Sequence, residues 1–145
     1  MKKVKSLLVS GLLVSLSFSM SYAGHFSGGF ASWKLTYGVG CGDSSIVRTA
    51  GLLGQTIPYK SYTGTSATPA SVKDRWVKAI VYQYKTSNLN TTAKKIHTMT
   101  HEFGHALSVA HPSNSSTDAV MKQGAQTTYN LKSYDKSSLK AKWGR

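Results

Sequence analysis

The stretch His101–His111, with the sequence HEFGHALSVAH, determines how the rest of the chain is interpreted. It contains HExxH, the helical pattern in which two zinc-binding histidines bracket a glutamate. Residues four apart lie on one face of a helix, so His101 and His105 can direct ring nitrogens at one metal ion. Glu102 lies about 100° further around the helix, where it misses the metal but can reach a water beside it. The pattern predicts a metal site with a general base next to it.

His111 stands six residues after His105, too far along to be a ligand from the same helix. The chain must therefore leave the helix and turn back if this third histidine is to reach the metal. Three neutral histidines leave one position of a tetrahedral zinc ion open, whereas a structural site would fill it with protein. The spacing therefore predicts a catalytic zinc site, with Zn²⁺ held by His101, His105 and His111, and a zinc hydrolase with Glu102 as its base.

The first residues of the 145-residue chain are typical of a secretory signal peptide. Lysines at positions 2, 3 and 5 precede an apolar run from Leu7 to Met20, and Ser21-Tyr22-Ala23 resembles a cleavage site. The apolar run is too short for a stable membrane span. We expect cleavage after Ala23, which leaves residues 24–145 as one secreted catalytic domain.

The composition narrows the range of partners. Lysine and arginine number 18 against five acids, a formal net charge of +13, but they are scattered and do not alternate with aromatic residues. We therefore expect no nucleic-acid binding and at most weak attraction to anionic cell surfaces. A peptide or protein substrate is what the family resemblance described below implies. The few carboxylates offer no calcium loop. Cys41 is the only cysteine, so no internal disulfide forms, and we expect a monomer.

The amino-terminal half has weaker patterns. Residues Trp33–Val39 alternate apolar and polar side chains and predict a strand. Asp43 could cap a helix whose apolar residues recur at helical spacing: Ile46, Ala50, Leu53 and Ile57. Residues Tyr59–Tyr62 could form a short strand, and the composition of residues 63–71 predicts a loop.

The carboxy-terminal half is clearer. Residues Trp76–Tyr84 are rich in β-branched and aromatic side chains, and this is the clearest strand pattern in the chain. Asn90 or Thr91 should cap the helix that carries HExxH, which should end near Leu107 or Ser108. Its expected core-facing residues are Ile96, Met99, Phe103, Ala106 and Leu107. A last helix is predicted from Ser133 to Trp143, with its lysines toward solvent: Lys136, Lys140 and Lys142.

From Trp76 to Gly144 the chain resembles the metzincin metalloendopeptidases, among them small bacterial matrixin-like proteases. The resemblance is carried by His101–His111, by a downstream methionine and by shorter matches: Ala79-Ile80-Val81-Tyr82, Met121 in Asp118-Ala119-Val120-Met121, Tyr134-Asp135-Lys136, Leu139 and Trp143-Gly144. It implies an α/β (α+β) fold with a twisted mixed β-sheet, an active-site helix, a backing helix and a carboxy-terminal helix. It also implies zinc bound by the three histidines, Glu102 as general base and Met121 in a tight turn beneath the metal. The strand at 77–84 would line the cleft and pair with an extended substrate.

Several positions depart from the family pattern or allow a second interpretation. Ser108 stands where the family usually has glycine, and a positive φ would cost serine about 1–2 kcal/mol. We expect His97, one turn before His101, to support the ligands from behind or to be a partly buried structural histidine, rather than a ligand itself. Met121 could be simple core filler. Asp135 could anchor the last helix to the turn around Met121, or merely favour the amino-terminal turn of that helix.

A different class of function also fits the sequence. A secreted basic binding protein could retain the metal site for structure, or as a relic, and adhere to an anionic surface. The presence of Glu102 argues against it, because a structural site has no use for a base. Cell-wall peptides are a further substrate class that the sequence does not separate from proteins.

Overall fold

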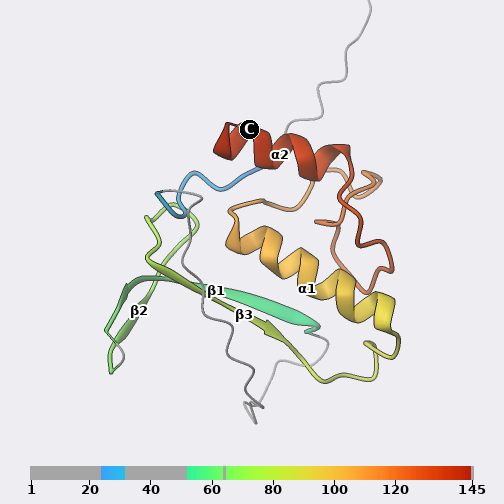
Figure 1. Cartoon of the computed structure of the whole chain (residues 1–145), viewed down its shortest axis with the longest axis horizontal. Helices are drawn as coiled ribbons and strands as arrows, with labels where there is room; N and C mark the ends of the chain where they lie inside the picture. The colour runs from blue at the N-terminus through green and yellow to red at the C-terminus, as the bar shows by residue number, and fades with distance from the viewer. Residues whose placement is uncertain (1–23, 32–51, 64, 145) are drawn as a thin grey trace, which may run out of the picture.

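The computed structural model describes residues 24–31, 52–63 and 65–144, which form a mixed α/β structure (Figure 1). Within these residues, three antiparallel strands form one sheet of order β2-β1-β3, and two helices complete the fold. The predicted signal peptide, the predicted strand at 33–39 and Cys41 lie outside the described residues. The described sheet is antiparallel throughout, so the expected mixed sheet is not what these three strands form.

Strand β1 (Gly54–Tyr62) is the centre of the sheet. It pairs with β3 (Lys78–Gln83) from Gly54 opposite Gln83 to Tyr59 opposite Lys78. The short β2 (Ala67–Pro69) pairs with the other edge of β1, only along Tyr59–Tyr62. The residues of β1 before Tyr59 therefore have a neighbouring strand on one edge only among the described residues.

The strand predicted at 59–62 is confirmed as part of β1. The strand predicted at 76–84 is confirmed as well, and it contains β3. The helix predicted from Asp43 to Ile57 is wrong at its end, because Gly54–Ile57 begin β1; its residues before Leu52 lie outside the described residues. Gly54 interrupts helical propensity, and β-branched Thr56 and Ile57 suit a strand. The loop predicted at 63–71 is also wrong in part, since it contains β2.

Helix α1 (Thr92–Ala106) lies across one face of the sheet, as Figure 1 shows, and packs on β1 and β3. Its predicted limits are confirmed: the Thr91 hydroxyl accepts a hydrogen bond from the Lys94 amide at 3.3 Å, and Leu107 is the carboxy-terminal cap. The predicted core face is wrong for Ile96 and Phe103, which are 43% and 52% exposed. The buried face of α1 is mainly polar: His97, Thr98, His101, Glu102 and Ala106.

Helix α2 (Ser133–Trp143) has the predicted limits and covers the segment after α1. Its Tyr134 joins a small buried apolar cluster with Val109, Ala119 and Met121. Lys136 and Lys140 are exposed as predicted, but Lys142 is not directed at solvent. Its ammonium group donates hydrogen bonds to backbone carbonyls of residues 26–28, because a long lysine stem can reach across to this segment.

The described amino-terminal segment, residues 24–31, packs beside the turn that follows α1. The Phe26 amide donates to the Ser108 carbonyl at 2.8 Å, and the Ala110 amide donates to the Gly24 carbonyl at 3.0 Å. The ring of Phe26 stacks on that of His105 with centroids 5.9 Å apart. At the other end, Nε1 of Trp143 donates to the Leu107 carbonyl at 3.0 Å, so both ends of the described structure meet at the turn between His105 and His111.

Candidate metal centre

The turn after α1 brings the third histidine back to the first two. The Val109 amide donates to the Gly104 carbonyl at 2.9 Å and the Ser108 amide to the His105 carbonyl at 2.8 Å, a Schellman motif. This motif needs a left-handed residue, and Ser108 has a φ of 67°, the only positive φ of a non-glycine residue in the described structure. The prediction that Ser108 adopts the conformation usual for glycine is confirmed.

The rings of His101, His105 and His111 converge. The Nε2 atom of His111 lies 3.0 Å from Nε2 of His101 and 3.0 Å from Nε2 of His105. The Nδ1 atom of His101 lies 3.0 Å from the Val120 carbonyl, and Nδ1 of His105 lies 2.9 Å from the Val109 carbonyl. A carbonyl only accepts, so both Nδ1 atoms carry the hydrogen and both Nε2 atoms direct a lone pair at the centre.

The surroundings keep these imidazoles neutral. Burial is the main cause that lowers the pKa of His101 and of His105 to about 4, and it also lowers the pKa of His111. Each histidine therefore has an unprotonated nitrogen at neutral pH, which is the form that binds metals.

The arrangement fits a metal ion. A hydrogen on Nε2 of His111 could satisfy only one of the two contacts, whereas a cation between the rings would satisfy all three lone pairs. A tetrahedral ion with nitrogens at roughly 2.0–2.1 Å holds those nitrogens about 3.3 Å apart, close to the 3.0 Å observed. The three predicted ligands thus form a cluster that could hold a metal ion.

Glu102 faces the same cavity as the three histidines. Its side chain is buried, and Oγ1 of Thr56 on β1 lies 2.9 Å from Oε2 and 2.7 Å from the backbone carbonyl of Glu102. Burial raises the pKa of the Glu102 carboxyl, and the hydrogen bond from Thr56 partly opposes this. Gly54 allows this close approach of β1 to α1, since a Cβ there would lie 2.8 Å from Cγ of Glu102.

The cavity has a volume of about 360 Å³ and is walled by α1, by residues 52–56 and by Gln123 and Gly124. The expected wall, the strand at 77–84, does not line it; β1 does. Thr56 and Gly54 are not predictable members of the site, because the apolar spacing of their segment predicts the end of a helix. The β-branched pair Thr56-Ile57 was the available indication of a strand.

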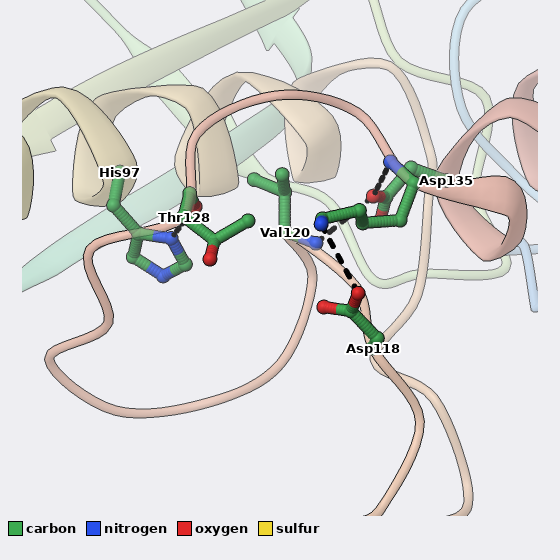
Figure 2. Close-up of polar contacts among 6 residues, drawn as sticks. His97, Asp118, Val120, Thr128 and Asp135 are labelled. Carbon is green, nitrogen blue, oxygen red and sulfur yellow. Dashed lines mark hydrogen bonds and ion pairs between the residues drawn. The ribbon is translucent and has the colours of Figure 1, made fainter.

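The turn around Met121 supports His101 from below. Its Val120 carbonyl receives the His101 hydrogen bond, and Met121 is buried with Sδ against Gly104, where an added Cβ would lie 2.2 Å from the sulfur. Asp135 of α2 accepts hydrogen bonds from the amides of Val120 at 2.9 Å and Met121 at 3.2 Å; Figure 2 shows the Asp135–Val120 contact. It also accepts from the Lys132 amide at 2.8 Å.

Both interpretations of Asp135 and Met121 are therefore combined in the structure. Asp135 anchors the turn and also caps the start of α2, and Met121 belongs to the turn and also fills the apolar cluster. His97 is more deeply buried than predicted and lies outside the histidine cluster.

Replacing Asp135 by asparagine is expected to lower the free energy of unfolding by about 2 kcal/mol. The NH₂ group of asparagine cannot accept a hydrogen bond, so at least one of the amides of Val120, Met121 and Lys132 loses its partner. Urea unfolding measures the change. Asp118→Asn removes the same charge at a side chain that is 73% exposed, and it should cost less than about 0.5 kcal/mol. Equal effects of the two variants would contradict the anchoring role.

Replacing Ser108 by glycine is expected to stabilise the protein by about 1 kcal/mol. The change relieves the positive φ and removes a buried hydroxyl that has no hydrogen-bond partner in the described structure. The melting temperature should rise by about 3–5 °C. Ser137→Gly, the same change inside α2, should have the opposite sign because glycine weakens a helix. A lower melting temperature for Ser108→Gly would show that the turn is not strained.

Neither helix of the described residues is long and apolar enough to cross a membrane. Comparisons of the chain with protein-family models, with curated proteins and with solved structures found no match.

Proposed function

We propose that this chain is a secreted zinc-dependent metalloendopeptidase of the metzincin type. The observation that carries the proposal is the convergence of three neutral histidine nitrogens in one cavity with a buried carboxylate that is not a ligand of the cluster. Three histidines are the donor set of catalytic zinc sites, and a structural site would have no use for a base beside them. Export through the signal peptide at 1–23 is part of the same proposal.

The mechanism divides the work between the metal and the protein. Zinc held by His101, His105 and His111 would lower the pKa of water toward 7 and polarise the carbonyl of a peptide bond. Glu102 takes the proton of the attacking water and delivers it to the leaving amine. Burial raises the pKa of Glu102, which brings the carboxyl closer to the neutral range where it can both accept and release a proton. Thr56 holds the carboxylate in place for both transfers.

The free edge of β1 is the proposed docking line for the substrate. Among the described residues, Gly54–Ile57 pair with β3 on one edge and with no strand on the other, and this part of β1 lines the cavity. An extended peptide can add to such an edge through backbone hydrogen bonds. The peptide would then cross the cavity with one of its carbonyls beside the histidine cluster.

A quenched-peptide library tests the proposal with the purified, zinc-loaded protein. We expect cleavage that a chelator abolishes and that added zinc restores. Stoichiometric zinc binding without cleavage of any peptide would contradict the proposal and favour a secreted basic binding protein with a structural or relic site. Cleavage that persists after complete removal of the metal would contradict it as well.

A further inference from the structure

The cavity extends beyond the three histidines to an end that the proposed mechanism does not use. His97 and Thr98 precede His101 and Glu102 by four residues, so they lie on the same face of α1, one turn or about 5.4 Å away. Both line the cavity, together with residues 52 and 53. This end, defined by Leu52, Leu53, His97 and Thr98, is called the distal pocket below.

The ring of His97 is fixed in one orientation and one tautomer. It is 1% exposed, and Nδ1 lies within hydrogen-bond distance of the Thr128 carbonyl, as Figure 2 shows. Because a carbonyl only accepts, Nδ1 carries the hydrogen in the neutral imidazole and Nε2 is then an acceptor. This buried Nε2 has no hydrogen-bond partner in the described structure.

Thr98, which also lines this pocket, has a second buried polar atom without a partner among the described residues. Its side chain is 4% exposed, and Oγ1 is buried without a hydrogen-bond partner in the described part of the chain. Its methyl group packs on Gly54, where an added Cβ would lie 2.9 Å from Cγ2. A hydroxyl can donate as well as accept. The pocket therefore has one fixed acceptor, one available donor and an aliphatic wall.

We propose that the distal pocket binds the side chain of glutamine in the substrate, next to the scissile bond; this inference rests on the proposed peptidase function. The carboxamide NH₂ donates to Nε2 of His97, and its oxygen accepts from Oγ1 of Thr98. The methylene groups pack on Leu52 and Leu53. In the substrate, the side chains of serine and threonine are too short to reach a pocket that lies one helical turn from the histidine cluster. Methionine has no donor, and ionised glutamate leaves Nε2 of His97 unpaired and brings a charge into the pocket.

Two measurements test the inference with one series of peptides that differ only by Gln, Met or Glu at a single position. The first measures kcat/KM on the zinc-loaded protein, with the varied residue placed on either side of the scissile bond. At one of these positions we expect the Gln peptide to be preferred by about 10-fold or more over both others, since a pocket built for hydrogen bonds discriminates against groups that lack them. Equal rates for the three peptides at every position would overturn the inference and leave the proposed function standing.

Variants assign the preference to the two side chains. Thr98→Val keeps the shape of the side chain and the His97 contact to Thr128, and it should reduce the preference for Gln over Met to about 2-fold or less. His97→Phe should do the same. Thr100→Val is the matched control, because Thr100 lies on α1 outside the cavity and its hydroxyl already bonds to the Ile96 carbonyl. A preference that survives both Thr98→Val and His97→Phe would overturn the assignment.

The second measurement is independent of catalysis. The Glu102→Gln protein is titrated with the same three peptides, and binding is followed by changes in NMR amide signals. We expect the dissociation constant of the Gln peptide to be at least about 5-fold lower than that of the Met peptide. Selective binding without cleavage by the parent protein would support the pocket and contradict the proposed function. Equal binding of the peptides would overturn the pocket.

Discussion

Replacing Glu102 by glutamine is expected to lower kcat by about 10²–10⁴-fold, the usual contribution of a positioned general base. Glutamine has the same shape, and its amide oxygen can still accept the hydrogen bond from Thr56, so the cavity should keep its form. Because Glu102 is not among the clustered metal ligands, zinc affinity should stay within about threefold. Turnover of the best library peptide and competition with a chromophoric chelator measure the two quantities.

The control for this variant is Asp118→Asn. It removes one negative charge at an exposed position after α1. The Asp118 carboxylate there forms an ion pair with Lys132 at 3.1 Å. We expect its turnover to remain within about twofold of the parent protein. Full turnover of Glu102→Gln would rule out the general-base role, whatever the result for zinc.

Replacing a metal ligand should have an equally large effect, on zinc affinity. Replacing His105 by alanine removes one of three converging nitrogens, and the remaining two should bind zinc at least about 10²-fold more weakly, more than the loss seen when a residue behind a ligand is changed. Turnover should fall in proportion to the fraction of the protein that holds zinc. Calorimetric titration of the metal-free protein gives the affinity, and circular dichroism shows whether the variant folds.

A matched variant separates ligand loss from the loss of any histidine. His25→Ala changes an exposed histidine whose Nδ1 only contacts the neighbouring Phe26 carbonyl. It should bind zinc as the parent protein does. His111→Ala is expected to repeat the effect of His105→Ala. Wild-type zinc affinity in either ligand variant would show that the cluster is not the zinc site.

The histidine cluster could be predicted from the sequence because its parts are local. The three histidines lie within eleven residues, and the helical repeat together with a turn at Ser108 determines their arrangement. The helix limits were predictable for the same reason, since Thr91 is a typical cap. Thr56 was not predictable, because it meets Glu102 across 46 positions of sequence.

The wrong helix at the end of residues 43–57 has a related cause. The apolar spacing of Leu53 and Ile57 fits a helix, and only pairing with β3, more than twenty residues away, reveals a strand. The predicted core face of α1 is wrong because hydrophobic side chains do not mark the buried positions of this helix. In this helix the buried positions belong to the site, so polar residues replace apolar ones there and Phe103 is left exposed.

The contacts at the turn after α1 have a consequence for the order of folding. Lys142 reaches the Phe26 carbonyl across 116 positions of sequence, and Asp135 holds the turn that supports His101. The Lys142 contact closes a long loop, and such a loop forms late because its entropy must be lost before the contact compensates for it. A growing chain that already contains HExxH therefore still lacks the contacts that hold the turn beneath His101 and the segment packed on His105. The ability to retain a metal ion should arise only when residues 132–143 have been added.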